Sequence, residues 1–206
     1  MNLEKFAARN GEDIVRLVRE NPLAWVVSGS GADVRATPLP IRPRLVADGG
    51  LDQLLGHFSR TNPQLDGLRR DPRAMILFMG PHGYVSPSWM SDRAQAPTWN
   101  YATAQFQVEL ELVEDGEGIE CLLRDLIDAM EEGRPGAWRM EELGKRYEGL
   151  SRGIVGFRAR ILDVQAVFKL GQDERDDTFA DIMTGLEATG ATALGAWMAR
   201  FSTRGG

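Results

Sequence analysis

The sequence predicts a mainly β protein with helices, an α+β fold of six to seven antiparallel strands closed into a small barrel with peripheral helices. Residues 102–112 alternate apolar and polar side chains, which is the pattern of a half-buried antiparallel strand. Turn signals such as Asp48–Gly50 separate several short apolar runs. No Gly-x-Gly-x-x-Gly or P-loop motif is present, and this argues against a doubly wound nucleotide-binding sheet.

The first third of the chain predicts one helix and three extended segments. Asn10 is placed to cap a helix that ends before Pro22. Leu23–Ser28 and Leu51–Phe58 have the composition of strands. Val34–Ile41 is also extended, but Pro38 and Pro40 restrict it to an edge or bulged position, because proline has no N–H for a sheet ladder.

Asn62 followed by Pro63 has the form of an N-cap and first helical residue, so a helix is expected from Pro63 to about Arg70. The continuous apolar run Ala74–Met79 predicts a central strand. Gly118–Glu132 carries apolar residues at helical spacing.

The last third predicts a long strand and a helical end. In Val155–Leu170 the alternating pattern changes phase near Ile161, which predicts a bulge that bends the strand around a barrel. From about residue 174 to 206, two apolar stripes separated by Gly190 predict a helical extension. We expect residues 1–206 to form a single domain, because 206 residues with 43% apolar content suffice for one substantial core.

Charge and cysteine content exclude several classes of protein. The net charge of -6 and the pI near 5.1 provide no general attraction to nucleic acid or anionic lipid, so we expect neither direct DNA binding nor membrane binding. Cys121 is the only cysteine, which rules out an intrachain disulfide. The longest weakly charged run is broken by glycine and proline. We therefore expect a soluble, cytoplasmic protein.

The stretch Gly80–Tyr101 concentrates rings, prolines and hydroxyls. It contains His82, Tyr84, Trp99 and Tyr101, and its prolines argue against a buried strand. The composition predicts a rigid loop with flat, polar-edged walls, which suits a planar ligand.

A second stretch, His57–Gln64, predicts an anion site. Here a strand delivers Ser59, Arg60 and Thr61 to the start of the helix capped by Asn62. The N–H groups of a first helical turn attract phosphate or carboxylate, and a guanidinium can add a bidentate grip. The alternative is that Asn62 is only a cap and Arg60 a solvated residue.

The two histidines of the chain, His57 and His82, lie in these two stretches. His57 at a strand end could be a haem axial ligand, and His82 a hydrogen-bond partner at a cofactor's edge, although packed structural roles are commoner. Zinc spacing and a Gly-x-Ser-x-Gly motif are both missing from the sequence, and we predict no metal site. Lys169 and Gln172 could reach a ligand from the barrel rim, or Lys169 could simply protect a strand edge.

Five ordered segments closely resemble the PaiB-type family, whose members are usually called FMN-binding negative transcriptional regulators. The segments are Gly56–Gln64, Gly80–Trp89, Pro97–Tyr101, Gly153–Phe157 and Lys169–Gln172. The resemblance implies an FMN-binding split barrel like that of pyridoxamine phosphate oxidase, normally a homodimer with cofactor sites at the subunit interface. It also extends to haem-dependent piperazate synthases, so both FMN and haem b remain candidate cofactors. Relatives often have histidine at the position of Pro38, serine at Gly171, asparagine at Asp173 and tyrosine at Met90.

Three hypotheses follow. In the first, a dimeric flavoprotein acts as a negative regulator, Ser59, Arg60, Thr61 and Asn62 hold the phosphate, and Tyr84, Trp99 and Asn100 border the ring. The resemblance adds the rest of the predicted site: His57, Gln64, His82, Ser86, Lys169 and Gln172. In the second, a haem enzyme with His57 as axial ligand acts on a small amine or hydroxylamine. In the third, a cofactor-free interaction module uses its aromatic loop at a dimer interface.

Overall fold

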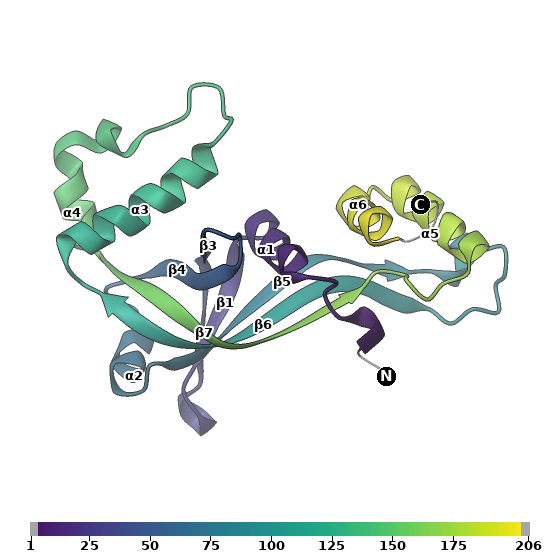
Figure 1. The fold of residues 1–206 in the computed structure, drawn as a ribbon, viewed down its shortest axis with the longest axis horizontal. Helices are drawn as coiled ribbons and strands as arrows, with labels where there is room; N and C mark the ends of the chain where they lie inside the picture. Colours follow the sequence, from purple (N-terminus) through teal and green to yellow (C-terminus); the bar gives the residue numbers. More distant parts are fainter. Residues whose placement is uncertain (1–3, 203–206) are drawn as a thin grey trace. The chain divides into compact units, whose positions relative to one another are not determined.

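A computed structural model describes residues 4–202 and contains a seven-stranded antiparallel sheet in the order β2-β1-β5-β6-β7-β4-β3 (Figure 1). The strands are β1 (Leu23–Ser28), β2 (Arg35–Pro40), β3 (Arg42–Leu45), β4 (Leu51–Ser59), β5 (Arg73–Val85), β6 (Thr98–Val113) and β7 (Ile154–Lys169). The α-helices are α1 (Gly11–Glu20), α2 (Gln64–Arg70), α3 (Gly116–Glu131), α4 (Tyr147–Ser151), α5 (Asp176–Ala188) and α6 (Thr192–Phe201). The short 3-10 helices are η1 (Glu4–Phe6), η2 (Gly31–Asp33), η3 (Pro87–Trp89) and η4 (Met140–Arg146).

The chain divides into two compact units. Unit 1 consists of the described residues up to Glu20, Met79–Ala104, and those from Gln165 onward. Unit 2 consists of Asn21–Phe78 and Gln105–Val164. Strands β5, β6 and β7 contribute residues to both units. The single domain expected from the sequence stays a prediction.

The core of unit 2 depends on close packing at the β4–β7 pair. Gly56 lies opposite Phe157, and a Cβ built on Gly56 would lie 2.6 Å from the Phe157 ring and 2.9 Å from Ile41 Cδ1. Phe157 is fully buried and its ring also contacts Phe58, with centroids 5.3 Å apart. Glycine at position 56 therefore makes room for the central ring of this core.

The neighbouring pair carries helix α3 on the opposite face of the sheet. Gly156 lies opposite His57, and a Cβ on Gly156 would lie 2.4 Å from Leu122 Cδ1 in α3. Because directly opposed residues point to the same face, His57 lies on the face that α3 covers. Asp125 of α3 also accepts a hydrogen bond from Arg42 of β3 at 3.2 Å. The helix thus packs closely where the strand lacks a side chain.

Unit 1 is organised around a stack of three rings. Phe168, Trp197 and Phe201 lie nearly parallel, with centroid distances of 5.1–6.0 Å. Helices α5 and α6 lie over one face of the strand ends in this unit (Figure 1). The indole Nε1 of Trp197 donates to Glu20 at the end of α1, at 2.8 Å. This bond links the first and last α-helices of the chain.

An ion pair between a buried carboxylate and an exposed arginine strengthens the same link. Asp13 in α1 is 4% exposed and accepts hydrogen bonds from the Arg9 guanidinium at 2.9 and 3.0 Å. Arg9 also donates to the Arg200 carbonyl at 3.0 Å, and its guanidinium lies 3.9 Å from the centre of the Phe201 ring. Burial alone would raise the pKa of Asp13, but the bonds to Arg9 outweigh burial and lower it.

Most predicted elements are confirmed. The proline-rich strand β2 lies at a sheet edge, as its composition predicted, and pairs with β1 from Leu23–Pro40 to Ser28–Arg35. Asn10 caps α1 by accepting from the Asp13 N–H at 3.1 Å. β7 is one continuous strand whose buried side chains are Val155, Phe157 and Ala159 near its start and Phe168 near its end, and the bulge near Ile161 stays a prediction. Helices α5 and α6 occupy the predicted helical extension.

The loop predicted over Gly80–Tyr101 is wrong at both ends. Strand β5 continues to Val85 and β6 begins at Thr98, so only the middle of the stretch is irregular. Pro81 is tolerated in β5 because the pairing with β1 covers Ala74–Leu77 and ends before it, which removes the need for an N–H toward that side.

The sequence analysis also missed β3, η4 and α4. Strand β3 follows β2 after Ile41 but lies at the opposite edge of the sheet, paired with β4. Segments η4 and α4 have neither a clear apolar period nor a proline-marked start, so sequence patterns offered no signal for them.

We expect Gly56→Ala to lower the free energy of unfolding by about 1–3 kcal/mol, because the added methyl overpacks the buried Phe157 ring. The matched control is Gly67→Ala in α2, where a Cβ would meet nothing within 4 Å. There we expect a gain of about 0.5–1 kcal/mol from helix propensity. Urea unfolding of both variants measures the difference, and equal effects would contradict the packing argument.

We expect Asp13→Asn to lower stability at neutral pH by about 2 kcal/mol, because it weakens charge-assisted bonds to Arg9. The pKa of Asp13 is lower in the folded state, so its contribution is present above the unfolded pKa of about 3.9. This contribution is lost as the pH falls through the folded pKa. Unfolding curves of both proteins across this range should therefore converge on acidification, and a constant gap would contradict the assignment.

Candidate functional site

The predicted anion site lies in unit 2, where β4 ends and α2 begins. Asn62 Oδ1 accepts from the Gln64 N–H at 2.9 Å, and Asn62 Nδ2 donates to Thr37 Oγ1 at 3.0 Å. The Asn62 side chain therefore holds the turn into the helix and ties it to β2. This matches the alternative in which Asn62 acts as a cap.

Gln64 is a buried structural tie. It is 2% exposed, and its Nε2 donates to the Val26 carbonyl at 3.1 Å and to Ser28 Oγ at 2.9 Å. Its Oε1 accepts from Thr37 Oγ1 at 2.7 Å. The amide thus joins α2 to β1 and β2, and both of its polar atoms have protein partners.

Arg60 forms hydrogen bonds to the chain at the beginning of β7. Its Nε donates to the Arg152 carbonyl at 2.8 Å and its Nη2 to the Ile154 carbonyl at 2.9 Å. Its Nη1 donates to Glu114 Oε2 at 3.3 Å, and Glu114 also accepts from Arg69 at 2.8 Å. Three of the five guanidinium N–H groups are therefore engaged inside the protein.

The exposed hydroxyls of Ser59 and Thr61 lie 2.9 Å apart and remain at the surface of this turn. The backbone N–H groups beside them serve the turn itself: those of Asn62 and Leu65 donate to the carbonyls of Ser59 and Asn62. Helix α2 is seven residues long. Of the side chains predicted to hold a phosphate, Ser59 and Thr61 are the two whose groups stay directed to solvent.

His57 is half-buried on the face of the sheet that α3 covers. Burial lowers its pKa, because the charged imidazolium is poorly solvated there. A haem bound to this imidazole would have to share the face with Leu122 and the rest of α3. His57 and Ser59 lie two residues apart on the same face of β4 and differ in exposure, since His57 is half-buried and Ser59 is exposed.

The predicted ring-binding residues in unit 1 form an exposed aromatic face made of His82, Tyr84 and Trp99. The Trp99 ring stacks against the His82 ring with centroids 6.4 Å apart, and it meets the Tyr84 ring edge-on with centroids 6.2 Å apart. Tyr84 is 46% exposed and Trp99 54% exposed. His82 is held by a 3.0 Å bond between Nδ1 and the Gly80 carbonyl. Three aromatic rings from β5 and β6 thus present one accessible surface.

Lys169 lies beside this aromatic face. Its Nζ donates to Thr98 Oγ1 and, at 2.9 Å, to the Trp99 carbonyl. These bonds place the ammonium group next to the backbone that carries the indole. The position agrees with a cation at the rim of a ligand site.

Asn100, Gln172 and Ser86 have structural roles. Asn100 follows Trp99 in β6, so it points to the opposite face, where it is 1% exposed and donates to Met198 Sδ at 3.5 Å. Gln172 closes the turn after β7 through the Phe168 carbonyl and the Leu170 N–H. Ser86 caps η3 by accepting from the Ser88 N–H at 3.1 Å.

The predicted phosphate residues therefore belong to unit 2 and the predicted ring residues to unit 1. Sequence reasoning missed Thr37 and Glu114, which orient Asn62, Gln64 and Arg60. Both contacts join distant parts of the chain, and no local pattern reveals them.

Within residues 4–202, no group of three or more His, Cys, Asp and Glu side chains gathers as metal ligands would. In the same part of the chain, no helix has both the length and the apolar character needed to cross a bilayer.

Comparison with solved structures identifies the fold. Similar structures include the flavocytochrome Anf3 from Azotobacter vinelandii, with a TM-score of 0.64 and 15% identity over 87% of this chain and 77% of that one. The FAD and heme binding protein from Mycobacterium smegmatis gives a TM-score of 0.60 with 21% identity over 86% and 79%. The conserved hypothetical protein Rv2991 from Mycobacterium tuberculosis gives 0.56 with 13% identity over 82% and 91%. The seven-stranded antiparallel sheet with its helices thus has the fold of these proteins and is the split barrel predicted from the sequence.

Comparison of sequences gives the family. The "Protease synthase and sporulation protein PAI 2" of Bacillus subtilis is 31% identical over 183 residues, which cover 88% of this chain and 86% of that protein. The profile of the family described as "Putative FMN-binding domain" matches residues 2–163. This chain is therefore a PaiB-like member of the "Putative FMN-binding domain" family.

Proposed function

We propose that this protein binds FMN, with the flavin ring on the aromatic face of His82, Tyr84 and Trp99. The observation that carries the proposal is the exposure of two large rings, Tyr84 and Trp99, on neighbouring strands. Exposed aromatic surfaces of this kind are used for ligands and partners. Family membership supports a flavin as the ligand.

The residues of unit 1 fit a flavin ring. Trp99 and Tyr84 supply flat apolar surface, the Lys169 ammonium lies beside Trp99, and His82 Nε2, which bonds to no other described residue, can meet a polar edge. Aromatic stacking together with a few polar contacts is the usual chemistry of such sites. Bound FMN would supply electron-transfer chemistry, which the side chains themselves lack.

We propose a smaller set of phosphate-binding residues than the sequence predicted. Ser59 and Thr61 keep exposed hydroxyls, whereas Asn62 and Gln64 have their side chains engaged in the fold. Arg60 retains unused N–H groups but is fixed by its backbone contacts. We therefore assign phosphate binding first to Ser59 and Thr61, and this set is tested separately from the aromatic face.

A regulatory role is supported by one observation, the name of the Bacillus relative, a protease synthase and sporulation protein. We propose that such a role acts through a protein partner or through the cofactor's state. The net charge of -6 opposes association with DNA phosphates, and no basic recognition helix stands out in the sequence. We also propose a homodimer, as the family resemblance implies.

The haem alternative rests on His57, and two proteins of similar fold are a flavocytochrome and a FAD and heme binding protein. It predicts a Soret band after reconstitution with haem that is lost in His57→Ala and kept in His82→Ala. The position of His57 beneath α3 makes the flavin the better-supported ligand.

We expect the purified protein to bind FMN, seen as quenching of flavin fluorescence with a shifted visible spectrum. Trp99→Leu should weaken binding about tenfold through lost stacking. The matched control is Trp25→Leu, because Trp25 is 50% exposed against 54% for Trp99 but lies on β1 in unit 2. This control should leave the FMN affinity unchanged. The double variant Ser59→Ala/Thr61→Val tests the residues proposed to bind the phosphate.

Three outcomes would overturn the proposal. Equal losses in both tryptophan variants would show that the effect is not specific to the aromatic face. A Soret band that depends on His57, without FMN binding, would establish the haem reading. Absence of either cofactor, with Trp99→Leu reducing the mass seen by light scattering, would identify a cofactor-free dimer module.

We expect the His57 imidazole to titrate below about 6.5 in the ligand-free protein, because burial disfavours its charged form. The unfolded chain takes up this proton first, so this group lowers stability as the pH falls from about 6.5 toward the folded pKa. Proton NMR follows the imidazole signals, and His57→Gln identifies the relevant one. A midpoint at or above 6.5 would contradict the position beneath α3.

A further inference from the structure

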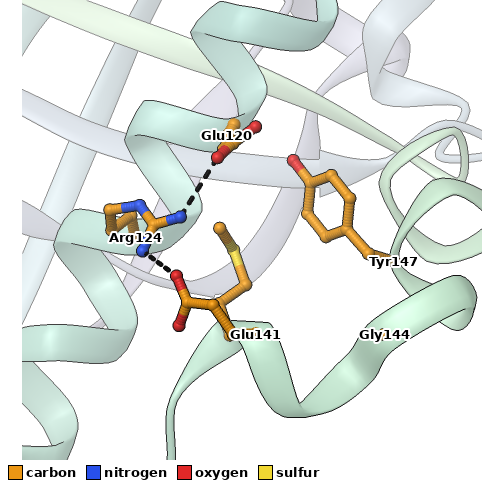
Figure 2. A pocket seen from close by; sticks show the side chains of 6 residues that line it. Glu120, Arg124, Glu141, Gly144 and Tyr147 are labelled. Carbon is orange, nitrogen blue, oxygen red and sulfur yellow. Dashed lines mark hydrogen bonds and ion pairs between the residues drawn. The ribbon is translucent and has the colours of Figure 1, made fainter.

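A pocket of about 220 Å³ lies within unit 2, between α3 and the segment formed by η4 and α4. Glu120 and Arg124 project into it from α3, Glu141 from η4 and Tyr147 from α4 (Figure 2). Met140, which is buried, supplies apolar wall. None of these residues belongs to the predicted flavin site.

The charged groups of the pocket are arranged around one guanidinium. Arg124 donates through Nη1 to Glu141 Oε1 and through Nη2 to Glu120 Oε1, the latter at 3.1 Å (Figure 2). These hydrogen bonds raise the pKa of Arg124, and the bond from Arg124 lowers the pKa of Glu141. The remaining Arg124 N–H groups and Glu120 Oε2 make no hydrogen bond to another described residue.

The Tyr147 hydroxyl is the unusual group of the pocket. Its oxygen is buried and makes no hydrogen bond of good geometry to a described residue, and Ser151 supplies the neighbouring hydroxyl. In Figure 2 it is directed toward α3, on the side where Glu120 projects. Burial, followed by the nearby charge of Glu120, raises its pKa, so the phenol is protonated at neutral pH. A buried donor without an acceptor is rare and calls for a partner.

Gly144 explains why both walls reach the same pocket. Its φ of 52° is favoured by glycine, and the chain bends there at a kink inside η4. The bend brings Glu141 on one side and Tyr147 on the other to face Arg124 and Glu120 (Figure 2).

We propose that this pocket binds a small α-amino acid. The unused oxygen of Glu120 would accept from the ligand's ammonium group. The Tyr147 hydroxyl and the free N–H groups of Arg124 would donate to its carboxylate. Met140 and the Tyr147 ring would contact a short alkyl side chain.

The combination of groups selects a zwitterion. A simple amine would satisfy Glu120 but leave the Tyr147 donor without an acceptor. A simple carboxylic acid would satisfy Tyr147 and Arg124 but place a negative charge beside two glutamates. An ammonium and a carboxylate on one carbon meet both requirements, and the pocket volume suits a small side chain.

The test is a two-dimensional NMR titration of the full chain, without added FMN, using L-valine as the probe. We expect saturable shifts of amide signals in α3, η4 and α4, with a Kd of about 1 mM or tighter. Isobutylamine lacks the carboxylate and N-acetyl-L-valine lacks the ammonium group. Each should bind at least about tenfold more weakly.

Two variants test the assigned contacts. Tyr147→Phe removes the hydroxyl and keeps the ring, and it should weaken L-valine binding about tenfold. Glu120→Gln should weaken L-valine binding while affecting N-acetyl-L-valine less. The matched control is Tyr101→Phe, because Tyr101 is a half-buried tyrosine of unit 1 and its replacement should leave the affinity unchanged.

The proposal is overturned if L-valine produces no saturable shift, since the pocket would then hold water only. It is equally overturned if the three probes bind alike or if Tyr147→Phe binds L-valine as tightly as the original protein. Circular dichroism establishes that each variant is folded. Should Tyr147→Phe unfold, the three probes and Glu120→Gln decide the matter. Because FMN is absent throughout, the outcome does not depend on flavin binding.

Discussion

The central constraint in unit 2 is the absence of two side chains at the β4–β7 pair. Gly56 lets the Phe157 ring lie against the strand on the core side, and Gly156 lets Leu122 of α3 approach the other side. Apolar side chains on both faces of the sheet therefore approach the backbone of β4 and β7 directly, because neither glycine has a side chain. The position of α3 follows from this contact, and so do the burial of His57 and the location of the pocket that Glu120 and Arg124 line.

The sequence revealed elements whose pattern is local. β6 alternates along its length, β7 changes phase in the middle, and the prolines of β2 restrict it to an edge. Each of these signals depends on the residues of one strand. By contrast, β3 is four residues long and contains Pro43 between two arginines, so its own residues carry no strand pattern, although its partner β4 is the next strand in the sequence. The loop predicted from Gly80 was wrong for a related reason. Whether a strand tolerates Pro81 depends on where its pairing with β1 ends.

Prediction of the site was limited in the same way. The sequence located groups able to hold an anion at Ser59–Gln64, but it could not show which of them the fold already uses. Arg60 donates hydrogen bonds to two carbonyls where β7 begins, and Gln64 forms hydrogen bonds with β1 and β2. Face alternation likewise separates Asn100 from Trp99, although the two are adjacent in sequence. A residue's chemistry can be read from its type, whereas its availability depends on partners that only the folded chain defines.

The contact between α1 and α6 has a consequence for how the protein can be divided. The family profile matches residues 2–163, yet Trp197 and the Arg200 carbonyl, far beyond residue 163, bond to Glu20 and Arg9 near the beginning. A shortened chain that stops at residue 163 would leave one face of α1 without its cover and would remove all three members of the aromatic stack. The end of the profile match and the end of a self-sufficient folding piece therefore differ, and recombinant fragments need to retain both α1 and α6.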